Sequence, residues 1–214
     1  MSKQKFLPIF PLSMVAFPNE VLHLHIFEDR YKQLINECLD EKKSFGLPTV
    51  HEKRVLEFGT EMQITKLEKT YEGGEMDIVV KGLGVFRILD IVKEVPGKLY
   101  MGAVVNELEN KPIQHGPTKG RLVAVVEELF KLLDVDKEID SKGDASYSYA
   151  LGHMVGFDLM QEYELLKHQG EATRQRIILE HVRNLLPSVK QIAEIKERAK
   201  LNGHFRLIHP PDIS

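Results

Sequence analysis

Apolar and polar residues alternate with a period of two in several stretches of the first half of the chain. Residues 22–26 alternate leucine or isoleucine with histidine, and residues 59–71 and 76–92 carry the alternation over longer runs. A period of two places successive side chains on opposite faces of a strand, so each run predicts a half-buried β-strand. Two further extended segments, 44–50 and 100–108, complete a β-rich first half.

Glycines and prolines mark where these strands turn, bend or end. Gly73-Gly74 predicts a two-residue hairpin turn, because both central positions of a type I′ turn need a positive φ. Gly82 and Gly84 interrupt the returning strand and predict a bulge or bend that curls the sheet toward a barrel. Pro8 and Pro11 cannot donate ladder hydrogen bonds, so the first strand is predicted at a sheet edge or a bulge.

The period changes to that of a helix at residues 28–40 and again through the second half. In the early helix the apolar residues share one face, and Glu28 and Asp29 suit the positive end of the helix dipole. Pro187 predicts a kink or a break inside the last helix. The second half as a whole predicts four helices, at 122–133, 145–156, 159–168 and 171–202.

The boundary between the two halves is predicted in the polar stretch 106–120, which holds two prolines and two glycines. We therefore expect three parts: a β-rich part at 1–112, a helical bundle at 113–202 and an extended tail at 203–214.

Composition narrows the classes of function. The chain has 214 residues, a formal net charge of −3 and a pI near 6.3, which gives no general attraction to nucleic acid or to an anionic membrane. No run reaches the roughly 18 apolar residues that a membrane-spanning helix needs, and no secretory signal is evident. The single cysteine, Cys38, fits a reducing compartment, so we expect a cytoplasmic protein.

Motifs for catalysis, metals and nucleotides are weak throughout. His23 and His25 lie on one face of a strand but have no evident third metal ligand. His51-Glu52 lacks the second histidine of the zinc-protease helix, and Gly82-Leu83-Gly84 lacks the third glycine of a dinucleotide fingerprint. We therefore expect no cofactor, no metal and no enzymatic activity.

The opening of the chain resembles one known family. The segments Phe6–Leu12, Phe17-Pro18 and Leu22–Tyr31 are similar in order and composition to the start of the Lon protease N-terminal, substrate-binding domain. Asn19 stands where that family often has glycine, and Asp29 where it often has proline. Later matches fall at Gly59-Thr60, at residues 81–88 and in the helical half.

The resemblance implies an α+β fold: a PUA-like β pseudo-barrel followed by an α-helical bundle with a long C-terminal helix. It implies a stand-alone domain without the ATPase and protease modules of Lon. The implied partners are unfolded or exposed polypeptide segments, and a cooperating protease or chaperone and a homo-oligomer stay open. For peptide contacts we select four aromatic and two arginine positions: Phe17, Phe27, Arg30, Tyr31, Phe45 and Arg87. Each of these also has a purely structural interpretation, as a core aromatic or as an ion pair at a helix start.

Other classes of function stay open at this point. PUA-like barrels of other families bind RNA, although the acidic balance argues against it, because phosphate affinity comes from clustered lysine and arginine. An enzyme with an unrecognised site, and an adaptor or oligomerisation scaffold using the charged last helix, are the remaining alternatives.

Overall fold

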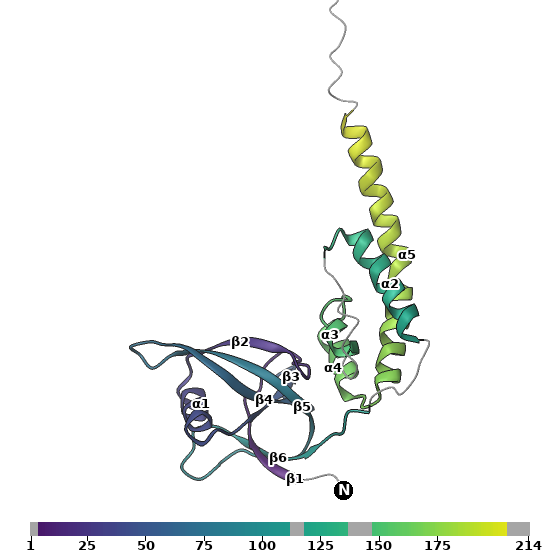
Figure 1. Cartoon of the computed structure of the whole chain (residues 1–214). Coiled ribbons are helices and arrows are strands. Elements are labelled where there is room, and N and C mark those ends of the chain that lie inside the picture. Colours follow the sequence, from purple (N-terminus) through teal and green to yellow (C-terminus); the bar gives the residue numbers. More distant parts are fainter. Residues whose placement is uncertain (1–3, 112–117, 137–146, 205–214) are drawn as a thin grey trace, which may run out of the picture.

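The computed structural model of the chain describes residues 4–111, 118–136 and 147–204. The first half holds six strands and one helix, and the second half holds four helices (Figure 1). The β-rich half contains β1 (Gln4–Pro8), β2 (Val21–Ile26), α1 (Asp29–Glu41), β3 (Phe45–His51), β4 (Arg54–Thr70), β5 (Met76–Val92) and β6 (Gly102–Glu107). The helical half contains α2 (Thr118–Leu133), α3 (Tyr147–Leu151), α4 (Leu159–Lys167) and α5 (Glu171–His204).

The six strands form one antiparallel sheet that closes on itself. Its order is β1-β6-β5-β4-β3, and β2 pairs with β5 beside this path. Isolated parallel bridges join Ile9 to Gly46 and Leu12 to Thr49, so the segment that follows β1 meets β3 at the other end of the order. This closure gives the predicted pseudo-barrel, and the α+β fold class is confirmed. The first strand lies at an end of the sheet, as its prolines predicted.

The bend in the barrel lies where the glycines of β5 predicted it. Glu61 pairs with Gly84 and Met62 pairs with Gly82, so Leu83 is the extra residue of a β-bulge. Glycine is required at position 82, because a Cβ there would lie 2.3 Å from the carbonyl oxygen of Phe17. The bulge therefore turns the strand and lets the β1–β2 connection approach the sheet.

The hairpin turn at Gly73-Gly74 differs from the prediction. Only Gly74 has a positive φ, of 80°. The Tyr71 amide donates to Glu75 and the Gly74 amide donates to Tyr71, which makes a three-residue loop in place of a two-residue type I′ turn. Glu72 lengthens the loop, so only one glycine is needed in the left-handed region.

The barrel core lies between the sheet and α1. Tyr31, Leu34, Ile35 and Cys38 form the buried face of α1, as its periodicity predicted. Burial also raises the pKa of the Cys38 thiol to about 12, so it stays protonated and packs as a small apolar residue.

The helical half packs mainly through α2 and α5. Figure 1 shows α2 alongside α5, with α3 and α4 between this pair and the barrel. The predicted helix at 145–156 is much shorter, since α3 ends at Leu151 before Gly152. The helix α5 runs through Pro187 without the predicted break and includes residues 203–204, which were expected in the tail. The rest of the tail, 205–214, lies outside the described residues.

The two halves share a core at their junction. Val15, Phe17 and Val85 of the barrel belong to the same buried cluster as the helices, including Tyr149 and Leu166. The barrel strands end at Glu107 and α2 begins at Thr118. The division at 112/113 stays a prediction. The shared core joins the parts on either side of it.

Candidate functional site: a cleft between the barrel and the helical half

A cleft opens where the two halves meet. Its barrel side is formed by Pro18 and Asn19 before β2, by Leu83–Val85 at the β5 bulge and by 108–110 after β6. Its helical side is formed by Tyr149 of α3, Leu166 of α4 and Gln169 of the α4–α5 connection. Every wall comes from a different element, so the cleft exists only because the halves are joined.

The lining of the cleft is apolar with a few polar groups. Leu83, Val85, Leu108 and Leu166 supply apolar surface, and the side-chain amides come from Asn19, Asn110 and Gln169. Among the described residues that line the cleft, Glu109 is the one with an acidic or basic side chain. Apolar walls with sparse hydrogen-bonding groups are typical of sites that bind an uncharged ligand or an apolar side chain.

The bulge places accessible surface at the mouth of the cleft. Leu83 is 47% exposed, because the bulge turns it away from the barrel core. At Gly84 an added Cβ would meet nothing within 4 Å, so open space lies beside this residue. The cleft can therefore accept a side chain from another molecule at this point without displacing its own residues.

The inner wall is held by the ring of Tyr149. Phe17 stacks on one side with its ring centroid 5.3 Å away, and the Arg174 guanidinium lies 4.0 Å from the Tyr149 ring centroid. The Tyr149 hydroxyl donates at 3.4 Å toward the carbonyl oxygens of Leu166 and His168. Burial raises the pKa of Tyr149 to about 12, so the hydroxyl keeps its proton.

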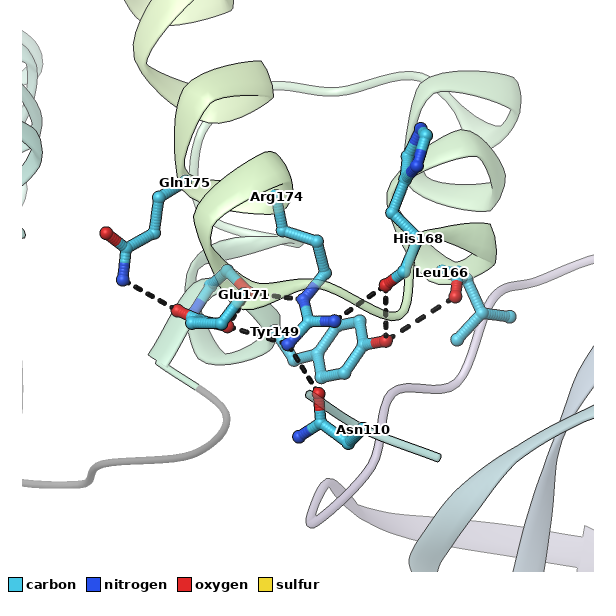
Figure 2. A network of polar contacts seen from close by, with 8 residues as sticks. Asn110, Tyr149, Leu166, His168, Glu171, Arg174 and Gln175 are labelled. Atoms are coloured by element: carbon cyan, nitrogen blue, oxygen red, sulfur yellow. Dashed lines mark hydrogen bonds and ion pairs between the residues drawn. The ribbon is translucent and has the colours of Figure 1, made fainter. Parts of the chain in front are cut away.

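Arg174 organises a buried polar network behind that wall (Figure 2). Its guanidinium donates to Ser148 Oγ at 2.7 Å, to the His168 carbonyl at 2.6 Å and to Asn110 Oδ1 at 2.8 Å. It also forms an ion pair with Glu171 at 2.7 Å, and both side chains are almost fully excluded from solvent. A buried charge is tolerable only when it is paired and hydrogen-bonded, and this one meets both conditions.

Glu171 completes the network on its other side. Its carboxylate accepts hydrogen bonds from the Ser148 amide, the Ser148 hydroxyl and the Gln175 side chain, as Figure 2 shows in part. The backbone adds a short bridge, in which the Lys111 amide donates to Gln169 and the Glu171 amide donates to Lys111. The chain that leaves the barrel is thereby fixed to α3, α4 and α5, which preorganises the cleft.

A second polar contact crosses the junction at His153. Its imidazole lies 2.7 Å from Glu162 of α4 and 3.2 Å from Glu20, which precedes β2. The hydrogen bond to Glu20 is the main reason that the pKa of His153 is raised, to about 9, and Glu162 adds to it. Glu20 also accepts a hydrogen bond from the Phe17 amide at 2.7 Å. The β1–β2 connection is therefore tied to the helical half beside the cleft.

The structure does not bring the six residues selected from the sequence into one site. Phe17 is buried under the cleft wall, where it supports Tyr149. Tyr31 and Phe45 are buried in the barrel core, where both rings pack around Phe10. These three side chains contribute through packing.

The other three selected residues are exposed at separate places. Phe27 is 61% exposed between β2 and α1. Arg30 pairs with Glu28 at 2.6 Å and lies over the ring of Tyr31, which matches the structural interpretation of the helix start. Arg87 pairs with Glu57 at 3.1 Å on β4. A role for any of them in binding stays a prediction.

The sequence analysis did not identify Arg174 and Glu171, whose buried network holds the wall of the cleft in place. A usable signal existed, because positions 174, 178 and 182 follow one another at helical spacing on one face, and the last two are apolar core residues. An arginine in such a stripe must be buried and therefore needs a buried partner.

In the part of the chain that the structure describes, no three His, Cys, Asp or Glu side chains gather as a metal site. His23 lies near Glu68 and His25 near Asp77, each as a surface pair. None of the described helices combines the length and apolar character that crossing a membrane requires.

The architecture is that of the Lon N-terminal domain. The Lon N-terminal domain protein of Xanthomonas campestris matches with a TM-score of 0.63 and 22% identity, over 86% of this chain and 98% of that one. The N-terminal domain of the Mycobacterium avium complex Lon protease matches with a TM-score of 0.62 and 16% identity, over 84% of this chain and 98% of that one. A barrel joined to a helical half with this geometry defines the fold class.

The family follows from the sequence as well. The family model of the ATP-dependent protease La (LON) substrate-binding domain matches residues 6–185, so the chain belongs to this family and the resemblance is confirmed. The Lon protease of Syntrophus aciditrophicus (strain SB) is 31% identical over 117 residues, which cover 49% of this chain and 14% of that protein. A LON peptidase N-terminal domain and RING finger protein of Schizosaccharomyces pombe is 30% identical over 107 residues, which cover 41% and 22%. The chain thus spans less than a quarter of the length of these relatives.

Proposed function

We propose that this chain is a non-enzymatic recognition module that holds an exposed, extended segment of another polypeptide in the cleft. Membership of the LON substrate-binding domain family supports a polypeptide as the ligand. An unfolded segment offers apolar side chains together with unpaired backbone N–H and C=O groups. The cleft offers apolar walls together with the side-chain amide of Gln169, a group that can both donate and accept.

The observation that carries this proposal is the open space at the β5 bulge. Leu83 is about half exposed and open space lies beside Gly84, so an incoming apolar side chain has both a surface to contact and room to enter. The buried Arg174 network fixes the opposite wall before any ligand arrives, which lowers the ordering cost of binding.

The remaining expectations belong to the same proposal. Phe27, Arg30 and Arg87 are exposed and could extend the contact surface beyond the cleft. A protease or chaperone would receive the segments that the module holds. The buried thiol of Cys38 is compatible with a cytoplasmic setting.

A matched pair of leucine variants tests the cleft. Leu83 and Leu89 lie on the same strand, have similar exposure at 47% and 45%, and only Leu83 lines the cleft. The probe is a fluorescein-labelled, reduced and carboxymethylated unfolded protein, followed by fluorescence anisotropy. Because a buried leucine contributes about 1.5–3 kcal/mol, Leu83→Ser should weaken binding by roughly tenfold or more, and Leu89→Ser should not.

A further variant adds a side chain inside the cleft, whereas Leu83→Ser removes one from its wall. Gly84→Val adds an isopropyl group, whose Cβ would enter open space, on a strand where valine is well accommodated. It should keep the thermal stability of the protein and abolish probe binding. Equal affinities of wild type, L83S, L89S and G84V for the probe would disprove the cleft as the site, and no binding by the wild type would disprove the function.

A further inference from the structure

The strand β2 has one edge without a partner strand. It pairs with β5 along its whole length, from Val21 opposite Lys81 to Ile26 opposite Met76. Within the described residues, no other strand and no isolated bridge joins residues 21–26. In the described part of the chain, these residues make no backbone hydrogen bond outside the β2–β5 ladder either. The second edge of β2 is therefore open.

The register shows which backbone groups face the open edge. The Gly82 amide donates to the Glu20 carbonyl and the Gly82 carbonyl accepts from the Asn19 amide, so both backbone groups of Gly82 point toward the chain that enters β2, as in a hydrogen-bonded pair. In an antiparallel ladder such pairs alternate with pairs that are not hydrogen-bonded to each other. Leu22, Leu24 and Ile26 consequently bond to β5, and Val21, His23 and His25 direct their N–H and C=O groups to the open edge.

The side chains along β2 leave this edge clear. His25 Nδ1 lies 2.7 Å from Asp77 on the partner strand β5, and His23 Nδ1 lies 3.3 Å from Glu68 on β4. Both imidazoles thus lean across the sheet, away from the open edge. Apolar side chains flank the two histidines, since Val21 is 54% exposed and Phe27 is 61% exposed.

The edge also lacks the features that normally protect a strand from pairing. Exposed edges are commonly blocked by proline, by lysine or by a covering segment. The other end strand, β1, has Lys5 and Pro8, and the chain that follows it is bridged to β3. In contrast, Val21–Ile26 contains neither proline nor lysine.

We propose that the open edge of β2 is a strand-addition site, which takes an extended segment of another polypeptide through its backbone. This inference rests on the proposed function and adds a second contact to it. A neighbouring strand supplies donors and acceptors at the two-residue spacing of His23 and His25, which no compact ligand does. Val21, the first residue of the edge, follows Asn19 of the cleft closely in the chain.

The chemistry of the site predicts its selectivity. The backbone of the ligand makes the hydrogen bonds, so binding tolerates many sequences but requires free amides at alternate positions. Apolar or β-branched side chains next to Val21 and Phe27 add contact area. Segments with proline or N-methylated residues at the pairing positions are excluded.

Two substitutions at position 23 distinguish the contribution of the backbone amide from that of the side chain. His23 directs its amide to the open edge, so His23→Pro removes that donor and keeps the ladder to β5. His23→Ala removes the same imidazole and keeps the amide. The probe is a fluorescein-labelled octapeptide of alternating threonine and valine, compared with a copy in which the amides of both the threonines and the valines are N-methylated, so that neither edge of the peptide can pair.

We expect the wild type and H23A to bind the unmethylated octapeptide within about threefold of each other, and H23P to bind it at least about tenfold more weakly. The N-methylated copy should bind the wild type at least about tenfold more weakly than the parent peptide. Equal binding of the two peptides overturns the site, and this comparison needs no variant. Equal loss in H23A and H23P also overturns it, as does a wild-type dimer that H23P dissociates.

The failure of this site differs from the failure of the proposed function. If H23P holds the unfolded protein probe as well as the wild type and L83S does not, the cleft function stands and the edge is not used. If the wild type binds neither probe, both proposals fail. A thermal melt of H23P, unchanged within a few degrees, shows that the variant retains its fold.

Discussion

The imidazole of His153 lies 3.2 Å from the carboxylate of Glu20, across 133 positions of the chain. His153 follows α3 in the helical half, and Glu20 belongs to the connection that enters β2. The ring of Phe17 packs 4.7 Å from the imidazole, so the ion pair and an apolar contact join the same two segments. The orientation of the two halves therefore depends partly on the charge of one histidine.

This contact makes the stability of the protein depend on pH. The pKa of His153 is raised from 6.5 to about 9 in the folded protein, so its contribution is complete below about pH 6.5 and is lost as the pH rises through about 9. The side chain is 37% exposed, and solvent screening limits the contribution to about 1 kcal/mol. Urea unfolding of the wild type and of His153→Gln at pH 6, 8 and 10 measures it.

The difference in unfolding free energy between the two proteins should shrink by about 1 kcal/mol from pH 6 to pH 10. Other groups that titrate in this range are common to both proteins and cancel. A difference that stays constant with pH would mean that His153 acts through packing on Phe17 alone.

The buried ion pair predicts a strong coupling between two positions. Arg174→Met leaves the Glu171 carboxylate buried without its cation, which should cost about 3–5 kcal/mol. In the double variant Glu171→Gln/Arg174→Met no unpaired charge remains, so the loss should be smaller than the sum of the single losses by at least about 1 kcal/mol. Chemical denaturation of the four proteins gives this cycle, and additive losses would contradict the coupling.

Two glycines that touch aromatic rings should respond differently to alanine. A Cβ at Gly152 would lie 2.3 Å from the Phe17 ring, which is buried and cannot move away, so Gly152→Ala should cost about 1–3 kcal/mol. A Cβ at Gly102 would lie 2.0 Å from the Phe6 ring, but Phe6 is exposed and can rotate, so Gly102→Ala should change stability by less than about 0.5 kcal/mol.

Thermal unfolding of the two variants tests this contrast. Phe17→Leu should recover part of the stability in the Gly152→Ala background and should have no such effect with Gly102→Ala. Equal melting temperatures of the two alanine variants would show that the close approach at Gly152 relaxes freely.

The aromatic residues selected from the sequence should separate into structural and surface positions. Phe45→Ala opens a cavity in the barrel core and should cost about 3–5 kcal/mol of stability. Phe27→Ala removes an exposed ring and should change the unfolding free energy by no more than about 0.5 kcal/mol. Unfolding in guanidinium measures both, and a large loss in F27A would reveal packing that its exposure does not indicate.

Much of the fold follows from local patterns in the sequence. The alternation at 22–26, the α1 stripe and the glycines of β5 are each visible within one short window of the sequence, so the pattern alone predicts the element. The failures have local causes too. Gly152 ends α3 well before the predicted position. At Pro187, where a kink or a break was predicted, α5 continues without a break and a kink stays a prediction, since the missing amide costs one hydrogen bond in a helix that α2 supports.

The cleft was beyond sequence reasoning because it is assembled from distant segments. Leu83, Asn110 and Tyr149 come together only through the bulge, the linker and the packing of α3. Aromatic identity likewise gave no indication of exposure, since Phe27 and Phe45 have the same side chain and opposite environments. Burial is decided by the closed barrel, which no single window of the sequence contains.

The closure of that barrel has a consequence for how the protein is made. The first strand pairs with β6, the last strand of the barrel, and its continuation meets β3. During synthesis β1 emerges first but has no strand partner until residues 102–107 have followed, so the barrel closes late. Until then the apolar side chain of Leu7 is accessible to chaperones, and the nascent protein is itself the kind of chain that it is proposed to hold.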